Sequence, residues 1–124
     1  MDPFIDFSKS LRSFRYAAMG VVSLFGQENN AKIHLLAGIL ITVAGCLFNI
    51  SALEWCIIVI QIALVWSAEA FNTAIEKLAD SISLEFHPLI KLAKDIAAAG
   101  VLILAGSAVI VASIIFIPKI LALL

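Results

Sequence analysis

Charged residues are scarce in this sequence, and their signs nearly cancel. Only 14% of the 124 residues are charged, eight of them basic and nine acidic, whereas 63% are hydrophobic. The mean hydropathy of +1.11 lies far above that of an ordinary soluble domain. With a formal net charge of −1, the chain has no general attraction for nucleic acid. The sequence therefore predicts a protein that is embedded in a lipid bilayer.

Several familiar catalytic motifs are also absent. There is no G-x-x-x-x-G-K-[ST] loop and no glycine-rich loop of the protein-kinase type, so a nucleotide would need another binding site. No H-E-x-x-H or paired C-x-x-C motif indicates zinc. The N-terminus shows no apolar run followed by a cleavage site, so we expect no removable signal peptide. Cys46 and Cys56 are interpreted as buried thiols inside membrane spans, although their places beside one turn leave a disulfide open.

Residues 4–27 have the pattern of an amphipathic helix. Basic residues at positions 9, 12 and 15 fall outside an apolar stripe with steps of three and four residues. The stripe consists of Phe4, Phe7, Leu11, Phe14, Ala18, Val21 and Phe25. Such a helix is typical of the interface of an anionic membrane, and it can also pack against the rest of the protein.

Three apolar stretches are long enough to cross a bilayer. We place these membrane spans at residues 33–50, 53–72 and 97–117, within a single domain covering residues 1–124. A turn is expected near Asn49, between the first two spans. The predicted fold class is an all-α membrane protein, with three transmembrane helices and an N-terminal amphipathic interfacial helix.

The second and third helices are expected to extend beyond the hydrocarbon. Helical periodicity continues past the second span to about Asp80, and the third helix should begin near Pro88 and end at Pro118. Small residues on one face of the first and third helices would permit close helix packing. These residues are Gly38, Thr42 and Gly45, and Ala105, Ala108 and Ala112.

The basic residues are distributed unevenly across the predicted membrane. Seven of the eight fall on the side of the N-terminus, and only Lys119 falls on the other side. The seven are Lys9, Arg12, Arg15, Lys32, Lys77, Lys91 and Lys94. The positive-inside rule then predicts that the N-terminus and the second loop lie in the cytoplasm.

One polar stripe marks the second helix. Glu69, Asn72, Glu76 and Asp80 are three, four and four residues apart, so they share an arc of about 80° on a helix. Glu69 should lie about one turn inside the hydrocarbon, and the others should descend into the cytoplasm. An ionisable residue at that depth is a functional candidate, although a carboxylate that only pairs helices is the alternative.

Other polar residues should lie at the depth of Glu76. Glu28 precedes the first span, and Lys94 and Asp95 precede the third. Acidic residues outnumber basic ones in this layer, so a polyphosphate would need a hard divalent cation such as Mg²⁺. His34 is interpreted as interfacial packing, whereas a histidine at position 87, in the polar loop, is a candidate ligand.

Two stretches of the sequence closely resemble the prokaryotic diacylglycerol kinase and undecaprenol kinase family. The first is E-A-F-N-T-A-I-E-K-L-A-D, from Glu69 to Asp80, and the second is H-P-L-I-K-L-A-K-D, which begins at His87. The resemblance extends over nearly the whole chain and includes the layout of three spans. The ending F-I-P-K at residues 116–119 is more similar to the Gram-positive undecaprenol kinase branch.

The resemblance implies ATP-dependent phosphorylation of the hydroxyl of a membrane lipid, either diacylglycerol or undecaprenol. It implies a homotrimer with composite sites, in which Glu69 is the general base and Glu28 and Glu76 hold Mg²⁺. The implied nucleotide contacts are Lys9, Tyr16, Glu28, Asn72, Glu76, Glu85, His87, Lys94 and Asp95, with Asp80 in support. Some members have arginine at position 9, and the lysine of this chain lacks the bidentate geometry of that arginine.

A small proton- or cation-coupled transporter subunit is the alternative function. A transporter carboxylate is expected near the bilayer midplane, whereas the polar stripe of this chain leaves the membrane. The placement of the stripe therefore favours a kinase.

Overall fold

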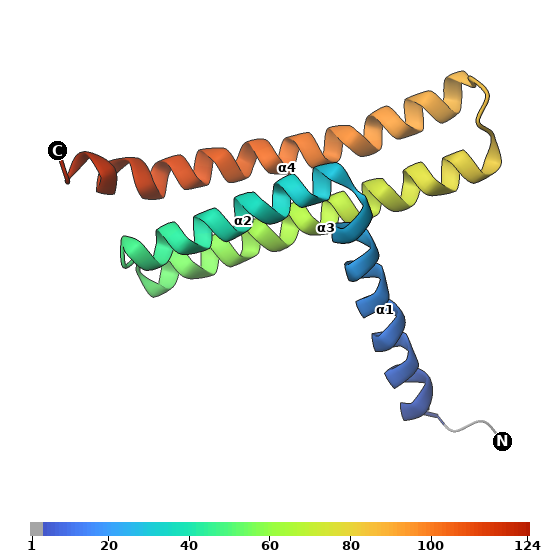
Figure 1. Cartoon of the computed structure of the whole chain (residues 1–124), viewed down its shortest axis with the longest axis horizontal. Helices are drawn as coiled ribbons and strands as arrows, with labels where there is room; N and C mark the ends of the chain where they lie inside the picture. The colour runs from blue at the N-terminus through green and yellow to red at the C-terminus, as the bar shows by residue number, and fades with distance from the viewer. Residues whose placement is uncertain (1–3) are drawn as a thin grey trace.

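The computed structural model describes residues 4–124, which form helices without any strand. The helices are α1 (Phe7–Gln27), α2 (Asn29–Leu47), α3 (Ala52–Ile82) and α4 (Pro88–Leu121). Figure 1 shows α2, α3 and α4 running lengthwise together, while α1 leaves them at a steep angle. The last three are long and apolar enough to cross a membrane. The predicted all-helical membrane fold is therefore confirmed.

The first helix begins later than its apolar pattern indicated. Asp6 caps α1, because its carboxylate accepts a hydrogen bond from the Lys9 backbone N–H at 3.0 Å and from Ser8 Oγ at 2.9 Å. These donors lower the pKa of Asp6. Phe4 therefore precedes the helix, and the predicted start at residue 4 is wrong. Apolar periodicity does not show at which residue a capping side chain starts the helix.

A tight turn joins α2 to α3. Asn49 has a φ of 49°, in the left-handed region, so α2 ends at Leu47 and the last residues of the predicted 33–50 span belong to the turn. Ser51 then caps α3. Its Oγ accepts a hydrogen bond from the Glu54 N–H at 3.2 Å, and the Glu54 carboxylate accepts one from the Ser51 N–H at 2.7 Å. This reciprocal pair is a capping box, which fixes the start of α3.

Two glycines of α2 lie directly beneath tryptophan rings of α3. A Cβ atom at Gly38 would come within 2.9 Å of Trp66 Cζ2, and one at Gly45 within 2.7 Å of Trp55 Cη2. The predicted close approach at these glycines is confirmed. Thr42, the third small residue of that set, is exposed and donates a hydrogen bond to its own helix instead.

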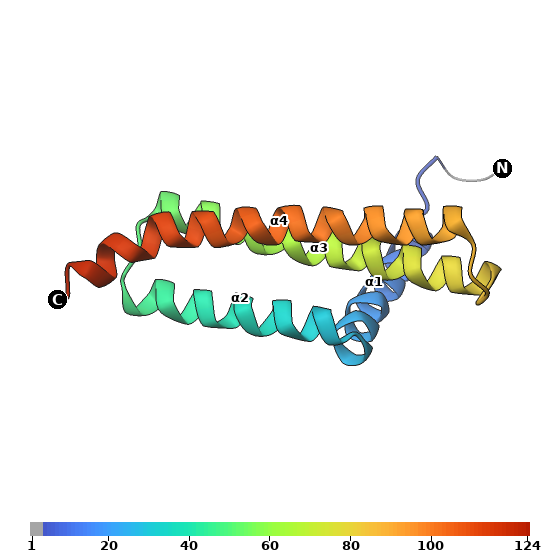
Figure 2. The same cartoon turned by 90° about the horizontal axis from the view of Figure 1, so that it is seen from above.

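The helices α3 and α4 form the most extensive packing in the chain. Figure 2 shows them side by side, with α2 set apart from α4. Near the turn between α2 and α3, Ile50, Ile58, Ile115 and Phe116 form the buried apolar core. The chain therefore has a tightly packed end near this turn and a more open middle.

Proline does not end the last helix as expected. Pro118 lies inside α4, which continues to Leu121. Proline removes one backbone hydrogen bond from a helix. The helix continues for only three residues after Pro118, to Leu121. Lys119 also forms an ion pair with Glu54 across the helices, with Nζ and Oε1 3.0 Å apart. This pair holds the end of α4 against the start of α3.

The two cysteines are free thiols. Cys46 and Cys56 form no disulfide with each other, and both are exposed on the surface of the single chain. Both lie in helices that are long and apolar enough to span a membrane.

We predict that Gly38→Leu lowers the free energy of unfolding by about 1–3 kcal/mol, because the new side chain overlaps the Trp66 ring and must push α2 away from α3. Thermal unfolding in detergent micelles measures this effect. The matched control is Gly106→Leu, since a Cβ there meets no atom within 4 Å. Equal melting temperatures for the two variants would contradict the packing described.

Candidate active site

Polar side chains are buried in the middle of α3. Glu69, Asn72 and Thr73 are only 2%, 6% and 7% exposed to solvent, although the surrounding sequence is apolar. The Asn72 Nδ2 donates a hydrogen bond to Glu76 Oε1 at 3.4 Å. The polar stripe anticipated on this helix thus contains an internal contact between consecutive members.

The innermost carboxylate of the stripe faces α2. His34 Nε2 lies 3.7 Å from Glu69 Oε2, and the two side chains are 21% and 3% exposed. Glu28 and Glu76 are also near enough to Glu69 for their charges to act on it. Three of the predicted site residues, Glu28, Glu69 and Glu76, are therefore brought into one neighbourhood by a single chain.

Glu28 stands at the junction between α1 and α2. Its backbone is extended, with φ −91° and ψ 123°, so the chain changes direction at this residue. Its Oε1 lies 2.9 Å from Lys77 Nζ on α3. This ion pair ties the junction to the outer part of α3, one turn beyond Thr73.

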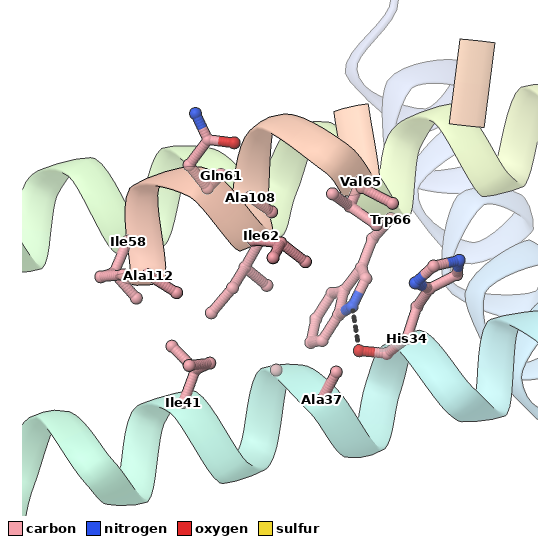
Figure 3. Close-up of a pocket in the computed structure, with 13 residues that line it drawn as sticks. His34, Ala37, Ile41, Ile58, Gln61, Ile62, Val65, Trp66, Ala108 and Ala112 are labelled. Carbon is pink, nitrogen blue, oxygen red and sulfur yellow. Dashed lines mark hydrogen bonds between the residues drawn. The ribbon is translucent and has the colours of Figure 1, made fainter. Parts of the chain in front are cut away.

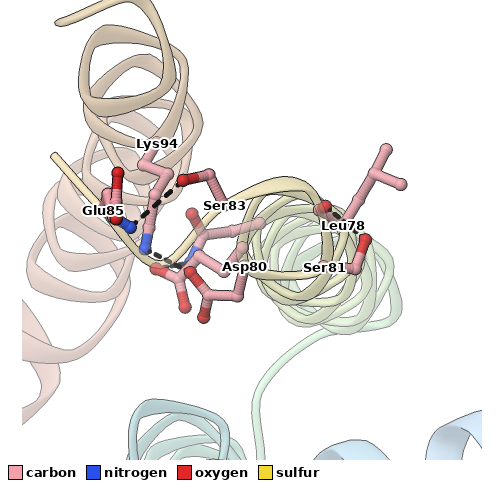
Figure 4. Close-up of polar contacts among 8 residues, drawn as sticks. Leu78, Asp80, Ser81, Ser83, Glu85 and Lys94 are labelled. Atoms are coloured by element: carbon pink, nitrogen blue, oxygen red, sulfur yellow. Dashed lines mark hydrogen bonds and ion pairs between the residues drawn. The ribbon is translucent and has the colours of Figure 1, made fainter. Parts of the chain in front are cut away.

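Asp80 and Lys94 join the outer ends of α3 and α4. The Lys94 Nζ donates to Asp80 Oδ1 at 2.9 Å (Figure 4). The hydrogen bond from Lys94 and the negative charge of Asp80 raise the pKa of Lys94, which precedes the predicted 97–117 span. Lys91 pairs with Asp95 within α4. The charged residues at the outer ends of α3 and α4 are thus paired in the single chain, but Glu76 takes part in none of these ion pairs.

The remaining predicted residues do not converge on Glu69. Lys9 and Tyr16 belong to exposed parts of α1, and this helix extends away from the other three in Figure 1. Glu85 lies in the connection between α3 and α4, where its N–H donates to Ser83 Oγ at 3.1 Å. The side chain of His87 caps α4 by accepting from the Leu89 N–H at 3.3 Å. A nucleotide contact from any of these four residues remains a prediction.

The site has oxygen atoms suited to a divalent cation. Within residues 4–124 there is no cluster of three or more histidine, cysteine or acidic side chains in a metal-binding arrangement. Mg²⁺, however, is commonly held by one or two carboxylates together with substrate phosphates. The Oδ1 of Asn72 is buried without a hydrogen-bond partner, beside the Glu76 carboxylate. This unsatisfied acceptor and the adjacent carboxylate fit a site completed by a bound cation.

An apolar cavity of about 270 Å³ lies between α2, α3 and α4. It is shown in Figure 3. The predicted small-residue face of α4 lines one side, with Ala105, Ala108 and Ala112, while His34 and Trp66 line the end nearest Glu69. The small side chains therefore leave open space in this single chain.

The place of His34 beside Glu69 was not predicted from the sequence. The signal lay in its distance from the turn: His34 is 15 residues before Asn49, and Trp66 is 15 residues after Ser51. In a helical hairpin, residues equally far from the turn lie opposite each other. Counting from the turn therefore places His34 within one helical turn of Glu69.

A buried carboxylate on a helix that continues into a charged layer marks a functional site in an all-helical membrane protein. The family described as prokaryotic diacylglycerol kinase matches residues 15–116. The chain belongs to this family and is a lipid kinase.

Individual relatives cover most of the sequence. The undecaprenol kinase of Bacillus subtilis (strain 168) is 36% identical over 92% of this chain and 93% of its own length. A diacylglycerol kinase of Synechocystis sp. is also 36% identical, over 92% of this chain and 66% of the relative. The diacylglycerol kinase of Escherichia coli (strain K12) is 31% identical over 78% of this chain and 80% of its own length.

We predict that Lys94→Ala raises the KM for ATP by about tenfold or more, because the expected charge-assisted contact of Lys94 with phosphate would be lost. Initial rates at varied ATP concentration measure the change. The matched control is Lys119→Ala, which also breaks an interhelical ion pair but at the opposite end of the helices. An unchanged KM in Lys94→Ala would contradict the phosphate role.

Proposed function

We propose that this chain transfers the γ-phosphoryl group of ATP to the hydroxyl of a membrane lipid at the cytoplasmic interface. The observation that carries the proposal is the buried carboxylate of Glu69, on a helix whose polar stripe continues outward through Asn72 and Glu76 to Asp80. A lipid hydroxyl remains at the interface, and a nucleotide remains in water. A base between these two depths can meet both substrates.

Glu69 serves as the general base in this proposal. Its carboxylate accepts the proton of the lipid hydroxyl as that oxygen bonds to the γ-phosphorus and the bond to ADP breaks. Lys94, at the water-exposed start of α4, contacts the phosphates and balances part of their charge. The chain contributes mainly by placing the reactants together, which is a large part of catalysis in phosphoryl transfer.

Glu28 and Glu76 are the proposed ligands of Mg²⁺. A bound Mg²⁺ would supply neutralisation of the phosphate charge. To bind the cation, Glu28 must release Lys77, or it must contact Lys77 with one carboxylate oxygen and the cation with the other. Asn72, with its unpartnered Oδ1, offers a further oxygen at the same level.

Diacylglycerol and undecaprenol are the proposed acceptors. Relatives named for each substrate share 36% identity with this chain, so identity does not separate them. Supplying the purified protein with labelled ATP and each lipid, and comparing the initial rates, identifies the acceptor. If neither lipid becomes labelled, the proposed function is wrong.

The working assembly in this proposal is a homotrimer in the bacterial cytoplasmic membrane, with the N-terminus in the cytoplasm. Neighbouring chains would cover the exposed apolar side chains of α1 and the apolar cavity between α2, α3 and α4. Lys9 and Tyr16 would then reach the site of a neighbour, since α1 leads away from the helices of its own chain (Figure 1).

We predict that Glu69→Gln abolishes turnover and leaves ATP affinity unchanged, because the amide cannot accept the proton and the residue makes no phosphate contact. Radiolabel transfer measures turnover, and equilibrium binding of a non-hydrolysable ATP analogue measures affinity. The matched control is the double variant Glu69→Gln with Gln61→Glu. It places a carboxylate two turns deeper on the same helix, and it should remain as inactive as Glu69→Gln alone. Near-normal turnover in Glu69→Gln would remove Glu69 from the mechanism.

We also predict that Glu28→Gln and Glu76→Gln each raise the Mg²⁺ concentration needed for half-maximal activity, by about tenfold or more, because each removes one anionic ligand. Glu54→Gln is the matched control, since Glu54 forms its ion pair at the other end of α3. Titration of activity with MgCl₂ measures the requirement. An activity of the parent protein that survives complete removal of divalent cations would contradict the proposed metal site.

A further inference from the structure

The Glu69 carboxylate has one partner among the residues that the structure describes. That partner is His34 of α2, with Nε2 3.7 Å from Oε2. The other ionisable groups close to Glu69 are Glu28 and Glu76, which carry charge of the same sign, and Glu28 is itself paired with Lys77. A buried carboxylate that is repelled by its neighbours needs a donor to keep it in one orientation. In this chain His34 is the side chain placed to do so.

The contact is fixed by the register between α2 and α3. Trp66 precedes Glu69 by three residues, so their side chains lie on the same face of α3. The Trp66 Nε1 donates to the backbone oxygen of His34 at 3.1 Å (Figure 3). The indole also covers Gly38 and meets Phe25 edge to face, with ring centroids 5.1 Å apart. A shift of α2 along α3 would break the contacts of the indole with His34 and Gly38.

We propose that His34 is a positioning residue for Glu69 and that Trp66 sets its place. This inference rests on the proposed function of Glu69 as the base. The imidazole directs its Nε2–H toward one carboxylate oxygen and leaves the other oxygen to face the lipid hydroxyl. Catalytic hydrogen bonds are often long without substrate and shorten in the reacting complex, so a separation of 3.7 Å suits this role.

The test compares His34→Ala with His34→Gln. His34→Ala removes the donor, and kcat should fall by about 10- to 100-fold, the range seen when a residue that orients a metal-binding side chain is removed. The KM values for ATP and lipid should stay unchanged, because His34 contacts neither. His34→Gln keeps an N–H donor near the carboxylate and should recover most of the lost kcat. Thr42→Ala, on the same helix, is the control expected to match the parent.

A separate variant tests the register. Trp66→Phe keeps an aromatic ring over Gly38 but removes the indole N–H, and it should lower kcat in the same direction with the melting temperature retained. This variant keeps the inference testable if His34→Ala does not fold.

Several results would overturn the inference. A parental kcat in His34→Ala would do so, as would a kcat in His34→Gln no higher than in His34→Ala. A loss that appears as raised KM values or a lowered melting temperature would make His34 a structural residue. A parent protein that phosphorylates no lipid would instead refute the proposed function, because no base would then need positioning.

Discussion

The length of α3 is the constraint on which the remaining structure depends. Its 31 residues extend about 46 Å at ~1.5 Å per residue, whereas the hydrocarbon of a bilayer is about 30 Å thick. The helix is also unbroken, so each face of its membrane part continues into its outer part. The polar stripe from Glu69 to Asp80 therefore passes from lipid to water without a change of direction. The other helices bring their polar residues to this fixed line.

The fold was largely predictable from the sequence because hydrophobic length and helical periodicity are local properties. Three long apolar stretches and the periodic spacing on the second of them are sufficient to predict three crossing helices and one polar stripe. The glycines of α2 were also recognisable, since close helix contact requires a missing side chain. These features depend on residues within one helix or on a simple hairpin.

Helix ends and tertiary partners were harder to predict. The start of α1 depends on the Asp6 carboxylate, and the end of α4 depends on contacts that outweigh one missing hydrogen bond at Pro118. The partner of Glu69 depends on the register of two helices, which no single helical pattern contains. The ion pair between Glu28 and Lys77 likewise depends on where α1 turns into α2.

The different lengths of α2 and α3 link the depth of Glu69 to the thickness of the bilayer. The 19 residues of α2 extend about 28 Å, close to the hydrocarbon thickness, while α3 is much longer. In a thicker membrane, hydrophobic mismatch draws more of the polar stripe into the hydrocarbon or tilts the helices to avoid it. In a thinner one, Glu69 moves toward the headgroups. If Glu69 is the base, as proposed, the thickness of the membrane would then set the depth at which the lipid hydroxyl meets that carboxylate.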